Sequence, residues 1–256
     1  MHLCKSYAII AAYFSKGELR MMNAYDGNVQ IFQMIEGAKQ AKGLTVVIDV
    51  FRAFSLEAYL FSWGVKEIRP VGTIEEAFRL KEMIPGSVLV GERKGKKCEG
   101  FDFGNSPCSI PPEAVAGKTI IHTTSSGTQG IVNAAGAREI ITGSLLNAGA
   151  VAGYIQKKQP EQVSIVAMGS MGIKPAAEDD LCAAYIKSLL EGAPLADMDQ
   201  RIKDLKAHGG QHFFDPAQRD VFPEEDFWMC TKRDQFSFVI KVDQDEMGYL
   251  AHRIDV

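Results

Sequence analysis

The sequence predicts an α/β fold, a three-layer α/β/α arrangement around a mostly parallel central sheet. Apolar runs of strand length alternate with segments of helical periodicity along most of the 256 residues. Several runs, such as residues 44–50, are apolar at nearly every position, which is typical of strands buried on both faces of a parallel sheet. No segment has the composition of a flexible linker, so we expect one domain over residues 1–256, with ample core.

Residues 1–40 read as a divergent N-terminal extension. An apolar run at residues 7–14 fits a short strand and is too short to cross a bilayer. The pair Met21-Met22 offers an alternative start of the natural chain. Apolar residues recur at helical spacing within residues 31–42, which predicts a helix there.

From residue 44 onward the predicted strands and helices alternate. The predicted strands cover residues 44–50, 67–71, 87–93, 118–124, 139–144 and 162–169. The predicted helices cover residues 53–63, 73–83, 126–135, 147–157, 176–190 and 197–208, with Thr73 as an N-cap. Residues 211–235 read as loops with short helical pieces, and residues 236–242 as a last edge strand. This alternation favours a parallel sheet covered by helices on both faces.

One short segment is echoed within the chain. Residues 64–68 (Gly-Val-Lys-Glu-Ile) resemble residues 136–140 (Gly-Ala-Arg-Glu-Ile), and each follows a strand, a polar elbow and a helix. The echo fits either an internal duplication or the general similarity of α/β units. A duplication would place the elbow at residues 49–52 and the elbow at residues 123–126 in equivalent positions.

The composition excludes several classes of protein. The net charge is −4 and no long basic run occurs, which argues against a nucleic-acid partner. No apolar segment is long enough for a membrane span. The five cysteines lack CxxC spacing, which argues against a disulfide framework or a zinc site and favours a reducing cytoplasm. Cys98 and Cys108 read as apolar fillers or as reactive thiols. These observations leave room for a homo-oligomer.

Polar residues at strand ends are the first candidates for chemistry, because ligands of open parallel sheets bind beyond the carboxyl ends of the strands. We expect these ends to share one edge of the sheet. Asp49 interrupts an apolar run, where a charge is costly unless it is paired or bound to a metal. It is therefore either a salt-bridge partner of Arg52 or a metal ligand or catalytic group. Arg52 itself has the fork geometry that grips a phosphate or sulfonate.

A second strand ends in Glu92 and Arg93, which offer a carboxylate and a guanidinium side by side. A third leads through a run of hydroxyl residues into a helix. Hydroxyls and backbone N–H groups at such a turn suit a phosphate, although many helix caps are equally rich in Ser and Thr. The candidate phosphate-binding residues of this turn are Thr124, Ser125, Ser126, Gly127 and Thr128.

Five carboxylates are candidate Mg²⁺ ligands. Magnesium prefers few carboxylates, several waters and substrate phosphate oxygens. Glu178 and Asp179 open a predicted helix, so favourable charge at a helix N-terminus is the alternative explanation for them. Adjacent acids on a helix diverge, which favours Glu178 and Asp179 over Asp180. The full candidate set is Asp49, Glu92, Asp102, Glu178 and Asp179.

Further candidate substrate contacts are Asn105 and Ser106, which otherwise read as a turn, and Ser144 and Asn147 at a later strand end. The five histidines form no metal-binding spacing such as HExxH. Of these, His122 reads as packing within a strand. His208 and His212 lie in a glycine-rich stretch where a lid is one interpretation.

Several of these motifs together resemble the 2-phosphosulfolactate phosphatase family, well over residues 44–190 and loosely beyond. The most specific piece joins Gly91-Glu92-Arg93-x-Gly95 to Glu99-Gly100-Phe101-Asp102-x-Gly104-Asn105-Ser106-Pro107. Other matching pieces are Asp49-Val50-x-Arg52-Ala53, Gly143-Ser144-x-x-Asn147-Ala148 and Glu178-Asp179-x-Leu181-Cys182-Ala183. The chain departs from the family at Phe54-Ser55, where a threonine cluster is usual, and at Ser125-Ser126, where the family turn reads Thr-Asn.

The resemblance implies an α/β/α fold, Mg²⁺ dependence and hydrolysis of a phosphate monoester on a small sulfonated hydroxy acid, a step of coenzyme M biosynthesis. Asp49, Arg52, Glu92 and Arg93 would carry the catalysis, with either a metal-activated water or Asp49 itself as the nucleophile. The altered turn motivates two alternatives. One is a non-catalytic binder of phosphorylated or sulfonated metabolites, and the other is a phosphatase for a different small organophosphate.

Overall fold

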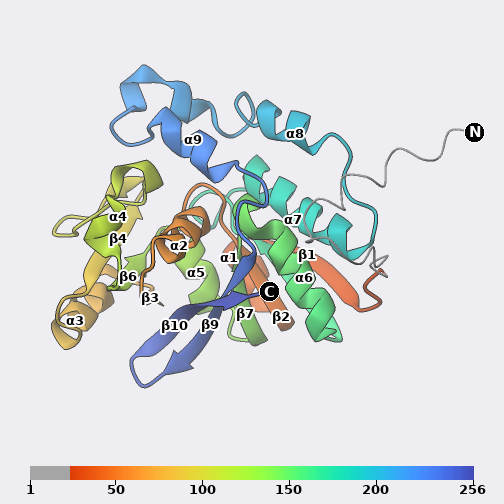
Figure 1. Ribbon diagram of the computed structural model, residues 1–256, viewed down its shortest axis with the longest axis horizontal. Helices are drawn as coiled ribbons and strands as arrows, with labels where there is room; N and C mark the ends of the chain where they lie inside the picture. The colour runs from red at the N-terminus through yellow and green to blue at the C-terminus, as the bar shows by residue number, and fades with distance from the viewer. Residues whose placement is uncertain (1–23) are drawn as a thin grey trace, which may run out of the picture.

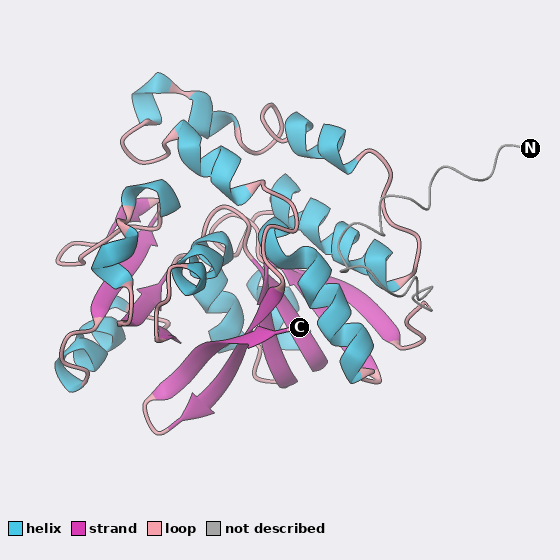
Figure 2. Ribbon diagram, viewed as in Figure 1, coloured by secondary structure: helices cyan, strands magenta, loops and turns pink. Residues whose placement is uncertain are grey.

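The computed structural model of the protein describes residues 24–256, and the run at residues 7–14 lies outside them. The described residues form the expected α/β/α arrangement around a ten-stranded, mostly parallel sheet (Figure 2). The strands are β1 Asn28–Gln33, β2 Gly43–Ile48, β3 Glu67–Pro70, β4 Val88–Arg93, β5 Lys96–Lys97, β6 Thr119–Thr123, β7 Ala137–Gly143, β8 Gln162–Ala167, β9 Phe238–Asp245 and β10 Gly248–Asp255. Their order across the sheet is β1-β8-β2-β7-β9-β10-β3-β6-β4-β5.

The helices fall close to the predicted positions. The α-helices are α1 Met34–Gln40, α2 Ala53–Ser62, α3 Ile74–Met83, α4 Pro112–Val115, α5 Gly127–Asn133, α6 Ala148–Lys158, α7 Ala177–Leu190, α8 Met198–Asp204 and α9 Glu224–Cys230. Short 3₁₀ turns are η2 Pro107–Ser109, η3 Leu145–Asn147, η4 Gln211–Phe214 and η5 Pro216–Gln218. Thr73 caps α3 as expected, accepting a hydrogen bond from the Glu76 backbone.

Side chains of β2 show why the strands read as unbroken apolar runs. Val46 and Ile48 enter one core cluster together with residues of α6 and α7, whereas Val47 enters another with α1, α2 and α5. The strand is therefore buried on both faces, as the pattern predicted. The cluster that contains Val47 also contains Val90 of β4 and Ile120 of β6, so it extends from β2 to the strands on the other side of the sheet.

One prediction was right only in part and one was wrong. Residues 28–33 form β1, which pairs in parallel with β8 over its whole length, so the helix expected over residues 31–42 is present only as α1, Met34–Gln40. The backbone hydrogen bonds offered by the sheet edge outweigh a helical periodicity that continues only through the short α1. The final strand was expected at an edge, but β9 and β10 form an antiparallel hairpin in the middle of the sheet.

The central hairpin divides the sheet into two parallel halves. One half contains β1, β8, β2 and β7, and the other contains β3, β6 and β4 with the short β5. The pairings β7–β9, β9–β10 and β10–β3 are all antiparallel, so the two halves run in opposite senses. The expectation of one shared edge in a single parallel sheet was therefore wrong, although the carboxyl ends of β2 and β6 still meet, as described below.

Two helices connect the two halves of the sheet, one in each direction. Helix α2 leads from β2 to β3, and α5 leads from β6 to β7. Each arriving strand pairs with the strand that sends out the other helix, β7 with β2 and β3 with β6. The echoed segments at residues 64–68 and 136–140 both follow these crossing helices. This reciprocal topology is the arrangement that the internal duplication would produce, and it brings the two elbows to the centre of the molecule.

The part of the chain after α7 covers the carboxyl ends of these strands. Helices α8 and α9 lie across the end of the molecule opposite to the tip of the β9–β10 hairpin (Figure 1). Among residues 24–256, no helix is both long and apolar enough to cross a membrane. Cys98, Cys182 and Cys230 are buried free thiols, and Cys108 is an exposed one.

Candidate active site

Asp49 lies directly after β2, where the two crossing helices begin. Its Oδ1 accepts a hydrogen bond of 3.0 Å from the backbone N–H of Ala53 in α2. Burial raises the pKa of this carboxyl to about 6, and the Glu92 charge adds to the rise, while hydrogen bonds from Ala53 and Gly127 oppose it. The Asp49 carboxylate thus sits between the N-termini of α2 and α5, with a charge that its surroundings only partly compensate.

Gly127 is the residue that lets the two elbows meet. A Cβ atom at this position would lie 2.7 Å from the Ala53 Cβ and 3.0 Å from the Asp49 Oδ2. Any larger residue would push the start of α5 away from Asp49. The predicted proximity of the 49–52 elbow and the 123–127 turn is therefore present, and it depends on the missing side chain.

Two further predicted carboxylates lie near Asp49. Asp179 is held by the backbone N–H groups of Val50 and Gly169, at 2.7 and 2.8 Å. The buried Glu178 Oε2 has no hydrogen-bond partner among residues 24–256. Burial raises the pKa of Glu178 to about 7 and that of Asp179 well above its usual value, and the nearby carboxylates raise both further.

Asp180, which the helix argument placed outside the site, instead accepts a hydrogen bond from Gln33 at 2.9 Å. The first half of the sheet therefore concentrates carboxylates at Asp49, Glu178 and Asp179, and no Lys or Arg in the described part of the chain pairs with them. Such an arrangement is costly unless the carboxylates are protonated or bind a cation.

Glu92 serves as a clamp between loops. Its Oε1 accepts from the Ser125 backbone N–H at 2.7 Å, and its Oε2 accepts from the Gly95 N–H at 2.6 Å and from the Ser125 hydroxyl at 3.2 Å. The structure thus brings Glu92 beside Asp49, as predicted. Its oxygens already order the loop after β4 and the turn before α5.

Arg93 and Arg52 differ in their partners. Arg93 is half-buried and donates to the carbonyl oxygens of Glu92 and Gly72 and to the Thr123 hydroxyl, none of which carries charge. Arg52 forms a buried ion pair of 2.8 Å with Asp226 of α9. The alternative explanation of Asp49 as the salt-bridge partner of Arg52 is therefore wrong.

Sequence reasoning missed Asp226, which lies 174 residues from its partner. The usable signal was its spacing in the segment that forms α9. Asp226 precedes the fully buried Phe227 and lies one helical turn before the fully buried Cys230, so it belongs to the inward face of the helix. A carboxylate on that face requires a cationic or hydrogen-bonding partner.

Most hydroxyls of the predicted phosphate-binding turn are engaged within the turn. The Thr124 and Thr128 side chains hydrogen-bond each other's backbone N–H groups at 3.1 and 2.9 Å. The Ser126 hydroxyl donates to the Gly169 carbonyl at 2.6 Å, and Ser125 is partly exposed and contacts Glu92. These residues shape the turn, and Ser125 lies at its accessible surface.

Asn105 belongs to a buried polar chain. The imidazole of His122 lies between the Glu57 carboxylate, 2.8 Å from Nδ1, and the Asn105 side-chain oxygen, 3.0 Å from Nε2. His122 is thus a hydrogen-bonded core residue that fixes the loop carrying Asn105. Ser106, next in that loop, contacts the hydroxyl of Ser109 at 2.9 Å.

Three predicted site residues have other roles in the structure. Asp102 accepts from the Leu89 backbone in the middle of β4 and pairs with Lys81, on the side away from Asp49. Ser144 and Asn147 follow β7, next to the end of β2, and form a capping box for η3. The Ser144 hydroxyl and the Asn147 side-chain oxygen are used within that cap, and the Asn147 amide nitrogen donates to the Phe238 carbonyl at 3.4 Å.

Magnesium was predicted, and the described carboxylates decide how it fits. Within residues 24–256, no group of three or more His, Cys, Asp or Glu side chains is arranged to hold a metal ion. This excludes an all-protein cage there and leaves the looser mode that Mg²⁺ prefers, with one or two carboxylates, water and substrate oxygens. Asp49 and the unpartnered Glu178 oxygen suit that mode.

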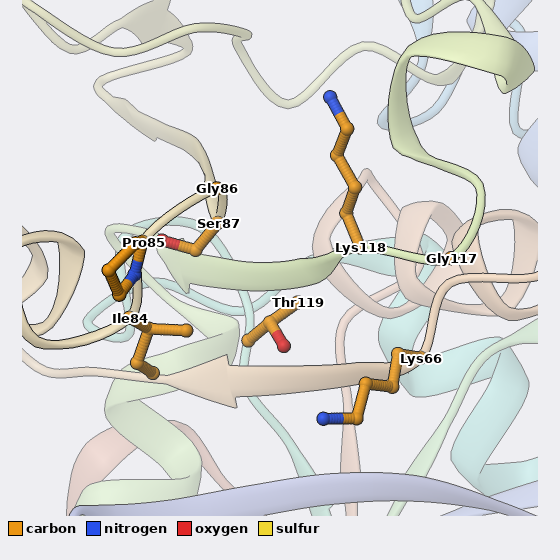
Figure 3. A pocket seen from close by; sticks show the side chains of 8 residues that line it. All are labelled: Lys66, Ile84, Pro85, Gly86, Ser87, Gly117, Lys118 and Thr119. Atoms are coloured by element: carbon orange, nitrogen blue, oxygen red, sulfur yellow. The ribbon is translucent and has the colours of Figure 1, made fainter.

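Two surface hollows lie away from this site. One, of about 270 Å³, lies at the starts of β3, β4 and β6 between Lys66, Ser87 and Lys118 (Figure 3). The other, of about 290 Å³, lies between the start of β7 and the β9–β10 hairpin. Both border strand starts or the hairpin, whereas the polar cluster lies at the carboxyl ends of β2, β4 and β6.

Comparison with known proteins identifies relatives of this chain. A profile of the 2-phosphosulpholactate phosphatase family matches residues 30–245. A probable 2-phosphosulfolactate phosphatase of Bacillus subtilis is 34% identical over 219 residues, which cover 85% of this chain and 94% of the relative. Proteins with the same description from Caldanaerobacter subterraneus and Thermotoga petrophila are 44% and 35% identical over 77% and 76% of this chain, and 86% of each relative. The chain belongs to the 2-phosphosulpholactate phosphatase family.

Proposed function

We propose that the chain is a Mg²⁺-dependent cytoplasmic phosphatase that hydrolyses 2-phosphosulfolactate to sulfolactate and phosphate, a step of coenzyme M biosynthesis. The observation that carries the proposal is a set of carboxylates without a cation and a guanidinium without an anion, both in the described part of the chain at strand ends that meet. Among residues 24–256, Asp49, Glu178 and Asp179 form a buried negative cluster without a paired cation. Arg93 donates to the Thr123 hydroxyl, just before the turn that carries Gly127, and its other partners among these residues are neutral carbonyl oxygens. A phosphate ester with a divalent cation satisfies both sides.

The residues of the two halves would divide the work. Asp49 and Glu178 would hold the magnesium, which when bound neutralises phosphoryl charge and lowers the pKa of a coordinated water. Arg93 would bind the phosphoryl oxygens through guanidinium donors, and the partly exposed Ser125, on the turn that Glu92 fixes, would contribute a hydroxyl. Glu92 would act by holding the Gly95 and Ser125 backbones in place.

The attacking group is either water or Asp49. The Asp49 carboxylate is oriented by the Ala53 N–H and faces the start of α5, which suits both a ligand and a nucleophile. Rapid-quench trapping separates the two, because a covalent mechanism yields an acyl phosphate on Asp49. Absence of labelled enzyme on the time scale of turnover assigns the attack to water.

The central test measures phosphate release from 2-phosphosulfolactate and from phosphate esters without the sulfonate. We expect turnover of 2-phosphosulfolactate in magnesium chloride and none in EDTA. Asp49→Asn should lower kcat/KM by about a thousandfold or more, because it removes a metal ligand or the nucleophile. Asp180→Asn, next to the cluster but outside it, is the matched control and should retain activity.

Normal magnesium-dependent turnover in both Asp49→Asn and Glu92→Gln would overturn this site. Calorimetric binding of the esters without any phosphate release would instead support a non-catalytic metabolite binder. Faster release from an ester lacking the sulfonate would support a phosphatase for another small organophosphate.

A further inference from the structure

The candidate site is covered in this structure. Asp49, Arg52 and Glu92 are only 5%, 4% and 7% exposed. A phosphate ester cannot reach side chains buried to this degree unless the covering residues move. The same burial raises the pKa of Asp49, so the cover also affects the electrostatics of the site.

The cover is the segment of residues 205–230, which we call the lid segment. Its Phe222 ring lies over the Arg52 guanidinium, 4.9 Å from the ring centre, and packs against Gly95. At its other end Gly209 has a φ of +116° and approaches Glu178 so closely that a Cβ atom there would lie 2.8 Å from Oε2. The lid segment therefore touches both the arginine side and the carboxylate side of the site.

One ion pair connects the lid segment to Arg52, the residue that precedes α2. Arg52 Nη1 donates to Asp226 Oδ2 at 2.8 Å and to the Val221 carbonyl at 2.9 Å, and both charged side chains are buried. The other Asp226 oxygen accepts from the Cys108 backbone at 3.0 Å. These three contacts link α9 and Val221, which lies between η5 and α9, to Arg52 and to the Cys108 backbone in η2.

The chemistry of the pair suggests an exchange. A carboxylate and a phosphoryl or sulfonyl group offer a guanidinium the same kind of anionic oxygen. Among residues 24–256, Arg52 Nη2 has one weak hydrogen bond, 3.3 Å to the Gly95 carbonyl, so these partners do not fill the fork. A buried guanidinium that loses its carboxylate is strongly destabilised until another anion replaces it.

We propose that Asp226 occupies, in the ligand-free chain, the place at Arg52 that an oxyanion of the ligand takes, and that this exchange releases the lid segment. Arg52 is then the residue that couples recognition of the anion to opening of the site. The inference rests on the proposed function only for the kind of ligand, a small phosphorylated or sulfonated anion. Gly209, whose φ is +116°, and Gly210 supply a hinge at one end of the lid segment. Opening separates Phe213 and Phe227 from the Phe51 ring that they contact in this structure.

The first experiment uses the full wild-type chain and inorganic phosphate as the probe. Hydrogen exchange is followed by mass spectrometry in magnesium chloride, with sodium chloride replacing phosphate at equal ionic strength in the second arm. We expect residues 221–230 to exchange roughly tenfold faster with saturating phosphate, because opening becomes more frequent. The β9–β10 hairpin should exchange at the same rate in both arms. Unchanged or slower exchange in residues 221–230 overturns the proposal.

The second experiment compares variants by calorimetric titration with phosphate. Asp226→Asn keeps the shape of the side chain and removes the competing charge, so phosphate should bind about tenfold or more tightly. The double variant Arg52→Gln with Asp226→Asn should lose that gain. Asp245→Asn is the matched control, since it removes one acidic partner of the buried Arg69, which also pairs with Glu67, and should leave phosphate affinity unchanged.

Equal or weaker phosphate binding by Asp226→Asn shows that the pair only holds the fold, and overturns the exchange. If that variant does not fold, the wild-type exchange experiment decides alone. Neither measurement uses turnover. Phosphate-driven release of the lid segment without ester hydrolysis would therefore keep the exchange and reject the phosphatase, whereas hydrolysis without release would do the reverse.

Discussion

The two halves of the sheet contribute opposite charges to one site. The first half brings Asp49, Glu178 and Asp179, whose pKa values are raised because burial and mutual repulsion are not offset by a cation. The second half brings Arg93, whose partners are neutral, and Glu92, whose oxygens are committed to backbone N–H groups. Asp49 and Glu92 are therefore similarly buried, but their hydrogen bonds indicate different roles.

After Asp49→Asn, the largest expected effect comes from the arginine side. Arg93→Gln should lower kcat/KM by on the order of 10²- to 10³-fold, because the phosphoryl oxygens lose a charged donor. Its effect on thermal stability should be small, since its present partners are neutral and the side chain is half-buried. Steady-state kinetics and thermal unfolding check both parts. A loss of stability without a change in kcat/KM would show that Arg93 stabilises the fold and does not bind the substrate, which would contradict the contrast between the two halves.

The carboxylate side should reveal itself in the pH dependence of stability without metal. The folded-state pKa values of Asp49 and Glu178, about 6 and about 7, exceed the usual values of 3.8 and 4.5. The folded chain therefore binds more protons, so the free energy of unfolding in EDTA should fall as pH rises from about 4 to about 7.

The loss should be on the order of 3 kcal/mol for Asp49, from the size of its shift. Magnesium chloride should restore stability, and more so at pH 8 than at pH 5.5. Denaturant unfolding at each pH, in EDTA and in magnesium, measures this. Asp49→Asn should flatten the dependence. A curve in EDTA that rises over the same range would show that the cluster is compensated by groups other than a cation.

The smallest effect is expected at Asp102, a predicted magnesium ligand that the structure places beside Leu89 and Lys81. Asp102→Asn should leave the magnesium dependence of turnover unchanged. It should cost about 1 kcal/mol of stability, through one weakened hydrogen bond and an exposed ion pair. A rise in the magnesium concentration needed for half-maximal activity would show that Asp102 contributes to the metal site.

Local sequence patterns predicted much of the candidate site. Asp49 was recognisable because a charge interrupted an apolar strand, and Gly127 because a hydroxyl-rich turn preceded a helix. The choice of Glu178 and Asp179 over Asp180 followed from divergence along a helix, and the structure places Asp180 against Gln33. The ion pair of Arg52 with Asp226 was beyond reach, because no short-range pattern specifies which of many acids a distant arginine meets.

By itself, the sequence determined the alternation of strands and helices, the burial of strands such as β2 on both faces, and the polar elbows at their ends. These follow from periodicity and from the cost of placing charge in an apolar run. The tertiary structure decided that β9 and β10 enter the middle of the sheet, that the halves run in opposite senses, and that the lid segment covers the site. Pairing between distant strands and ion pairs across the core depend on contacts that any single segment of sequence leaves open.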